Sequence, residues 1–210
     1  YYAMISHVDW CVGNILDVLR EKNLLEDTII VFTGDNGLAV GQHGLMGKQN
    51  IYEHSVGVPL VLRGPGVPKG RVDERFVYLL DIFPTLCDLC GMETPPTVDG
   101  LSFAPMFRDP DYVTRPELYL AFQSRIRGVM DERYKLIEYR TEDLKLTQLF
   151  DLERDPWEKN NFYDIAGYEA VTARLRERLL ALRDEWDDES TLFGQQYWRQ
   201  WRQYEAAEVH

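Results

Sequence analysis

One short segment restricts the fold of this 210-residue chain more than any other. Residues 28–33 read TIIVFT, a run of β-branched and aromatic residues without polar alternation. Such a run is typical of a strand that is buried on both faces of a parallel sheet. It ends at once in Gly34-Asp35-Asn36-Gly37. Because functional sites in open α/β sheets often follow the carboxyl ends of buried strands, the segment predicts an α/β protein with a site at this turn.

The charge balance and the apolar runs exclude two classes of partner. Lys and Arg total 23 against 35 Asp and Glu, which gives a net charge of −12. An excess of acidic residues repels a phosphate backbone, so we expect no nucleic-acid partner. The longest apolar runs have the length of strands and fall well short of the ~18 residues of a membrane helix. We therefore expect no membrane partner.

The three cysteines carry no predicted chemistry. An odd number cannot close a disulfide framework within one chain. Cys87 and Cys90 form a C-x-x-C pair, but no second pair completes a zinc site and no thioredoxin-like context surrounds it. The spacing predicts two thiols on one face of a helix.

The first half of the chain predicts three further elements. Apolar residues at helical spacing favour a helix over residues 1–21 with one face against a core. Residues 58–62 predict a strand that is short, bulged or at an edge, because Pro59 removes a ladder donor. Residues 81–90 predict a helix that Gly91 stops.

The second half predicts a different architecture. Beyond a proline-rich stretch, short strand candidates separated by polar turns favour an antiparallel meander. They occupy residues 118–123, 128–130, 134–139 and 148–152. A long helix is expected over 164–185, and the acidic run at 184–189 reads as a solvated face or turn. The aromatic tail that follows either packs on its own domain or on a neighbouring subunit. This change of character divides the chain into domains 1–94 and 95–210.

The glycine-rich loop after the first strand holds the candidate site residues. Asp35 and Asn36 are adjacent oxygen donors that could bind a hard divalent cation, although Asp-Asn-Gly is also a common turn. Lys48, beside Gly47, can place an ammonium on an anionic group, and taken alone it also reads as a solvated lysine. His43 is ambiguous when considered singly.

The combination of segments is more specific than any of its residues. Five segments closely resemble, in the family's order, the second half of the sulfatase catalytic domain and the C-terminal subdomain that follows it. They are TIIVFTGDNG, GQHGLMGKQNIYEHSVGVPLVLRGPG, YLLDIFPTLCDLCGM, RYKLIEY and LFDLERDPWEKNNF. The resemblance implies the C-terminal part of an alkaline-phosphatase-like α/β sandwich, followed by a small subdomain of antiparallel sheet and helix.

The resemblance also implies roles for the loop residues in a sulfuric ester hydrolase. Asp35 and Asn36 match the family's metal ligands, and the metal is usually Ca²⁺. Lys48 matches the lysine that contacts the sulfate group. His43 matches a histidine that lies near the substrate mouth in some members. Gly57 departs from the pattern, since many relatives carry arginine there.

The family's nucleophile is not found in this sequence. Sulfatases use a formylglycine made from Cys or Ser in a Cys/Ser-x-Pro/Ala-x-Arg motif, and no cysteine or serine here has that context. We expect the formylglycine and the remaining metal ligands upstream of Tyr1, and we expect the isolated chain to be inactive. The implied partners are a sulfate-ester substrate and that N-terminal part, while homo-oligomerisation stays open.

Two alternatives remain at this point. A phosphonate monoester or phosphodiester hydrolase of the same superfamily often has Asp-His where this chain has Asp35-Asn36. The amide oxygen of Asn36 favours calcium, whereas imidazole would admit manganese or zinc, so the pair favours the sulfatase. A non-catalytic fragment is the other alternative, and the presence of Asp35, Asn36 and Lys48 argues against it. Neither the natural substrate nor the compartment follows from the sequence.

Overall fold

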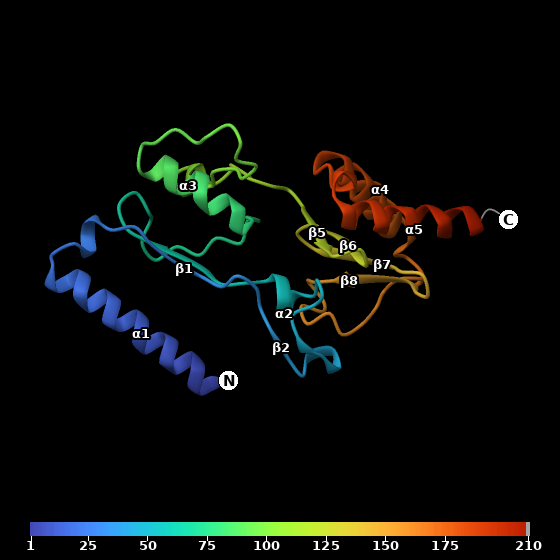
Figure 1. The fold of residues 1–210 in the computed structure, drawn as a ribbon, viewed down its shortest axis with the longest axis horizontal. Coiled ribbons are helices and arrows are strands. Elements are labelled where there is room, and N and C mark those ends of the chain that lie inside the picture. The colour runs from blue at the N-terminus through green and yellow to red at the C-terminus, as the bar shows by residue number, and fades with distance from the viewer. Residues whose placement is uncertain (209–210) are drawn as a thin grey trace. The chain divides into compact units, whose positions relative to one another are not determined.

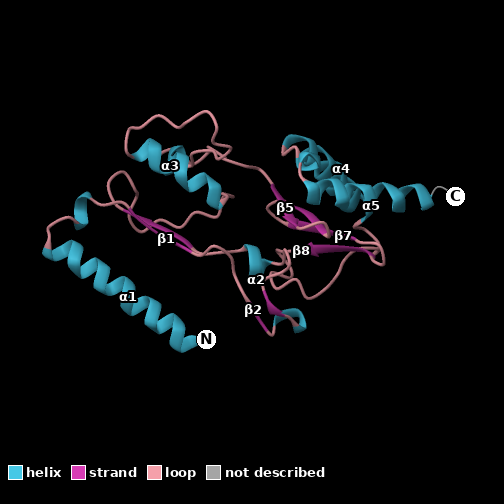
Figure 2. Ribbon diagram, viewed as in Figure 1, coloured by secondary structure: helices cyan, strands magenta, loops and turns pink. Residues whose placement is uncertain are grey.

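A computed structural model describes residues 1–208, which form two compact units (Figures 1 and 2). The first unit combines residues 1–34 and 59–114, and the second combines residues 35–58 with the chain from Arg115 onward. Among residues 1–208, every helix is too short or too polar to span a lipid bilayer. The domain boundary that the sequence suggests after residue 94 stays a prediction.

The first unit contains two α-helices, two strands and three 3-10 turns. The helices and strands are α1 (Tyr2–Glu21), β1 (Ile30–Thr33), β4 (Leu60–Arg63) and α3 (Ile82–Leu89), and the 3-10 turns are Leu25–Asp27, Leu79–Asp81 and Ala104–Phe107.

The strand predicted from TIIVFT is present as β1, but its predicted environment is wrong. β1 pairs antiparallel with β4, with Ile30 opposite Arg63 and Thr33 opposite Leu60. The sheet has these two strands alone in the described chain. A two-stranded ribbon covers its own faces poorly, so Phe32 keeps 42% of its surface exposed. An unbroken apolar run therefore did not identify a parallel, doubly buried strand here.

The two helices of this unit differ in how well their environment was predicted. α1 forms as expected, but the prediction that its stripe faces a core is wrong within residues 1–208. None of its residues is buried, and Met4 is 70% exposed. α3 also forms as expected. Asp81 is fully buried before it and accepts the backbone N–H groups of Tyr78 and Leu101 at 2.8 and 2.7 Å, and Gly91 ends the helix at φ +67°.

The second unit contains a four-stranded sheet with helices and a hairpin around it. Its elements are β2 (Ala39–Val40), β3 (Met46–Gly47), α2 (Glu53–Val56), β5 (Leu118–Phe122), β6 (Ile126–Met130), β7 (Tyr134–Arg140), β8 (Lys145–Asp151), α4 (Glu169–Glu185) and α5 (Leu192–Glu208), with 3-10 turns at Gln42–Gly44 and Asp188–Ser190.

The predicted antiparallel meander is confirmed. Strands β5, β6, β7 and β8 pair in sequence order, and every pair is antiparallel. Across the sheet Val129, Leu136 and Leu149 lie opposite one another and are completely buried. Because side chains alternate between the faces of a strand, these three residues define one face of the sheet.

Helices α4 and α5 pack on this face, as Figure 1 shows. The aromatic tail belongs to α5, and its Tyr197 and Trp198 are fully buried in the core with Leu175 and Leu179 of α4. The tail therefore packs on its own unit. The predicted long helix is confirmed as α4, but it begins at Glu169 because Gly167 adopts φ +97°.

The acidic run after α4 is not simply a solvated face. Asp188 accepts hydrogen bonds from Tyr119 Oη at 2.9 Å, Trp198 Nε1 at 2.7 Å and Arg127 Nε at 2.7 Å. The Arg127 side chain is 1% exposed. Asp188 therefore neutralises a buried guanidinium and ties the sheet to α5.

The opposite face of the sheet holds residues 50–56. Ile51 is 2% exposed and packs so closely on Gly128 of β6 that a Cβ there would lie 2.6 Å from Ile51 Cδ1. Tyr52 Oη donates to Gln148 Oε1 at 2.8 Å, and its ring meets Phe150 edge to face. These contacts fix the end of the glycine-rich loop on the sheet.

Candidate active site

Three of the predicted site residues come together in the structure. Lys48 Nζ donates a hydrogen bond to Asn36 Oδ1 at 2.9 Å and lies 3.9 Å from Asp35 Oδ2. The cluster is open to solvent, since the side chains of Lys48 and Asp35 are 54% and 87% exposed. An ammonium thus stands beside one carboxylate and one amide oxygen.

A short hairpin returns Lys48 to the Asp-Asn turn. β2 pairs antiparallel with β3, with Ala39 opposite Gly47 and Val40 opposite Met46. Gly47 adopts φ +130°, a conformation that favours glycine. The hairpin therefore reverses the chain and brings Lys48, which follows Gly47, back to the Asp-Asn turn.

Local hydrogen bonds orient both oxygen donors. The backbone N–H of Asn36 donates to Asp35 Oδ1 at 2.9 Å, and the Asn36 side-chain Nδ2 donates to the Gly37 carbonyl at 2.9 Å. The amide nitrogen faces its own backbone, so Oδ1 points away from it. The two side chains therefore present oxygen atoms, and not the amide nitrogen, on the side where Lys48 lies.

The Asp-Asn turn rests directly on α2. Gly37 N–H donates to the Ser55 carbonyl at 2.9 Å. A Cβ at Gly37 would lie 2.0 Å from the backbone oxygen of His54, so only glycine fits this approach. The last residue of the Asp-Asn-Gly motif is thus explained by backbone packing.

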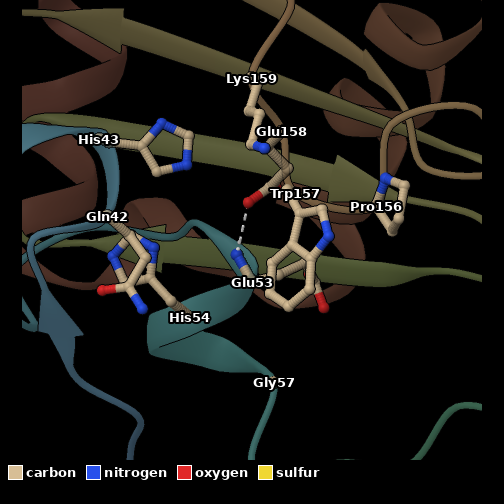
Figure 3. A pocket seen from close by; sticks show the side chains of 9 residues that line it. All are labelled: Gln42, His43, Glu53, His54, Gly57, Pro156, Trp157, Glu158 and Lys159. Carbon is tan, nitrogen blue, oxygen red and sulfur yellow. Dashed lines mark hydrogen bonds between the residues drawn. The ribbon is translucent and has the colours of Figure 1, made fainter.

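His43 contacts a different group of side chains. Its ring stacks on Tyr52 with centroids 4.2 Å apart and planes within 5°, and it lies 5.5 Å from the His54 ring. Figure 3 shows these histidines on the wall of a pocket of about 690 Å³. The pocket is lined by Gln42, His43, Glu53, His54, Gly57, Pro156, Trp157, Glu158 and Lys159.

Burial disfavours the charged form of His54. It lowers the pKa of the imidazole below 6.5, and the nearby His43 and Lys135 lower it further. Nε2 of His54 is buried and has no hydrogen-bond partner within residues 1–208. His54 is therefore held as a neutral imidazole at the pocket wall near neutral pH.

A buried ion cluster beneath the pocket escaped the sequence analysis. The Lys135 side chain is 0% exposed, and its Nζ lies 2.8 Å from Glu53 Oε1 and 2.9 Å from Glu158 Oε1. Burial raises the pKa of Glu158, while the charge of Lys135 opposes that shift. The available signal was a lysine in the segment RYKLIEY, within a predicted strand of the antiparallel meander.

The donor set of the Asp-Asn turn is small. Within the described part of the chain, no three His, Cys, Asp or Glu side chains gather in a way that could hold a metal ion. The turn offers carboxylate and amide oxygens, which suit a hard cation, but Ca²⁺ takes about 6–8 oxygen ligands. The two residues fit part of such a site.

The sequence matches a known family over most of its length. Residues 41–185 match the family model described as N-sulphoglucosamine sulphohydrolase, C-terminal. The chain is 34% identical to choline-sulfatase from Rhizobium meliloti, over 98% of this chain and 41% of the relative. It is 31% identical to arylsulfatase K from Bos taurus, over 87% of this chain and 36% of the relative. The chain thus spans about two fifths of the length of these relatives.

Two solved structures have folds similar to that of this chain. One, determined in complex with its substrate D-glucosamine-2-N,6-O-disulfate, has a TM-score of 0.82 at 28% identity, covering 90% of this chain and 40% of that chain. The phosphonate monoester hydrolase of Agrobacterium radiobacter has a TM-score of 0.77 at 33% identity, with coverages of 88% and 40%.

Proposed function

Because this chain belongs to the sulfatase family, we propose that it forms the C-terminal part of a sulfuric ester hydrolase and supplies part of its active site. The observation that carries the proposal is the convergence of Lys48 with Asp35 and Asn36. We expect the formylglycine nucleophile in a part of the complete enzyme that corresponds to the segment of the relatives outside the match with this chain. Sulfate-ester hydrolysis is then a property of the complete enzyme.

Asp35 and Asn36 are proposed to hold a divalent metal, with Ca²⁺ as the expected ion. Their orientation supports this role, since Asn36 Nδ2 is engaged by Gly37 and Oδ1 is turned outward. A hard cation prefers carboxylate and carbonyl oxygens. When bound, the cation supplies a Lewis acid that polarises the oxygens of the sulfuryl group.

Lys48 is proposed to contact the sulfate group of the substrate. Its ammonium is a compact charge that can follow the negative charge as it builds on the ester oxygens. The hydrogen bond to Asn36 holds Lys48 beside the metal pair. His43 is proposed to contact the substrate from the pocket wall, where Tyr52 fixes its ring.

Hydrolysis of phosphonate monoesters or phosphodiesters is the second candidate. The likeness to the phosphonate monoester hydrolase of Agrobacterium radiobacter favours it. Asn36 argues against it, because an amide oxygen is a harder ligand than imidazole and favours calcium over manganese or zinc. A non-catalytic module is a third candidate, and it leaves the cluster around Lys48 without a role.

One comparison of substrates tests the proposal. The complete enzyme is assayed with an aryl sulfate and with the matching aryl phosphonate, after chelation and after addition of Ca²⁺ or Mn²⁺. We expect the larger kcat/KM for the sulfate with Ca²⁺. A larger value for the phosphonate with Mn²⁺ would favour the second candidate, and no turnover of either ester would support the third.

A further inference from the structure

We propose that Lys135 is a positioning residue that holds the Asp35-Asn36 pair in place through Glu53 and α2. The inference rests on the proposed metal role of this pair. It adds a buried lysine of β7, far from the turn in sequence, as a support for the residues proposed to bind the metal.

Lys135 anchors the first residue of α2 in two ways. Its Nζ donates to Glu53 Oε1 at 2.8 Å, which fixes the side chain of Glu53. It also lies 2.9 Å from Glu158 Oε1, and Glu158 Oε2 accepts the backbone N–H of Glu53 at 2.7 Å. Figure 3 shows the hydrogen bond between Glu53 and Glu158. The backbone and the side chain of Glu53 therefore depend on one ammonium.

The short helix needs this anchor. α2 has four residues, and a single turn is unstable by itself because nucleation fixes several dihedral angles for few hydrogen bonds. Glu158 also occupies a left-handed conformation at φ +54°, which is costly for a residue other than glycine. Such a conformation persists when surrounding contacts enforce it, and here the side chain of Glu158 is fixed by Lys135 and Glu53.

α2 in turn supports the turn that carries the oxygen donors. Gly37 N–H donates to the Ser55 carbonyl at 2.9 Å, and the Gly37 carbonyl accepts Asn36 Nδ2 at 2.9 Å. Hydrogen bonds thus link Lys135 to Glu53, Ser55 to Gly37, and Gly37 to the side chain of Asn36, and the backbone of α2 joins the first link to the second. If α2 shifts, the carbonyl that orients Asn36 shifts with it.

The test uses Lys135→Met, which keeps an unbranched side chain one atom shorter than lysine and removes its charge. The matched control is Arg140→Met, because Arg140 is also fully buried on β7 and pairs with Glu138 at 2.9 Å, away from α2. Both variants should lower the melting temperature, since each removes a cation that pairs with a buried carboxylate, Glu158 in the first and Glu138 in the second.

Amide hydrogen exchange at Gly37 separates positioning from general destabilisation, because it reports local opening. We expect Lys135→Met to raise the Gly37 exchange rate about tenfold or more, and Arg140→Met to change it less than about twofold. If Lys135→Met does not fold, Glu53→Gln replaces it, and we expect a rise of at least about threefold. An unchanged Gly37 rate in the variant used, or an equal rise in Arg140→Met, would overturn the inference.

A second readout connects the inference to the metal. In the complete enzyme, calorimetric titration with Ca²⁺ should show about 10–100-fold weaker binding for Lys135→Met, the range for losing a residue that orients a ligand. Arg140→Met should bind like the wild type. Equal affinity of Lys135→Met and wild type would overturn the inference. A wild-type enzyme that binds no divalent cation would remove the metal site itself, while the Gly37 exchange rates would still report whether Lys135 holds the turn.

Discussion

Lys48 donates a hydrogen bond to the side-chain oxygen of Asn36 at 2.9 Å, although the two residues are 12 positions apart in the chain. The β2–β3 hairpin creates this contact by reversing the chain between them. The oxygen that Lys48 holds is also the one proposed to bind the metal. Two positive charges near one oxygen repel each other, so we expect Lys48 to turn toward the anionic substrate once a cation is bound.

Replacement of Lys48 by alanine is predicted to lower kcat of the complete enzyme by roughly 10²–10³-fold, the scale of losing one preorganised donor to the transition state. Lys48→Arg should restore activity only in part, because a planar guanidinium does not replace a compact ammonium. Steady-state kinetics with an aryl sulfate measure both variants. Lys69→Ala, at an exposed loop lysine, is the control and should behave like the wild type.

The kinetic pattern decides between two roles for Lys48. A rise in KM with unchanged kcat would mean that Lys48 only binds the ground state. Wild-type values for both parameters in Lys48→Ala would remove Lys48 from the site.

The purified 210-residue chain is predicted to hydrolyse no aryl sulfate. None of its cysteines or serines lies in the motif from which the formylglycine is made. Activity should require the remaining part of the enzyme with its matured Cys or Ser. Turnover of an aryl sulfate by the purified chain alone would contradict this prediction.

Replacement of Asp188 by asparagine is predicted to destabilise the second unit by about 3–5 kcal/mol, because it leaves a buried guanidinium unpaired. Although burial alone would raise the pKa of Asp188, its hydrogen bond and charge interaction with Arg127 hold that pKa below its ordinary value. Denaturant unfolding followed by tryptophan fluorescence measures the loss. The exposed neighbour Asp187 supplies the control, and Asp187→Asn should stay within about 0.5 kcal/mol of the wild type.

Protonation of His54 is predicted to destabilise the fold. Because the pKa of His54 is lowered in the folded chain, the unfolded chain binds more protons than the folded chain once the pH falls below about 6.5. The contribution of His54 to stability is therefore present above this pH and decreases as the pH falls toward the lowered pKa. Glu158 acts in the opposite direction, since its raised pKa lets the folded chain bind more protons above pH 4.5.

A comparison of variants isolates the contribution of His54. Melting temperatures are measured between pH 5 and pH 8, and the wild-type curve should fall more steeply toward acid than the curve of His54→Gln. His7→Gln, at an exposed histidine of α1, should follow the wild type. Parallel curves for wild type and His54→Gln would show that His54 does not govern this pH dependence.

Local patterns predicted the elements of this protein well. Closely spaced strand candidates and polar turns identified the β5–β8 meander, and helical spacing identified α1, α3 and α4 with small errors at their ends. These features depend on residues near one another in the chain, where propensity and turn chemistry act directly. Family motifs also predicted Asp35, Asn36 and Lys48 as site residues.

Tertiary structure alone decided what surrounds each element. The apolar run of β1 gave no indication that its partner would be β4 in an antiparallel ribbon, because strand pairing depends on distant residues. Asp188 and Lys135 read as an acidic turn residue and a strand lysine, yet each is paired at the centre of a buried network. A buried charge is tolerated only where the fold brings it a partner, so its role depends on contacts across the structure.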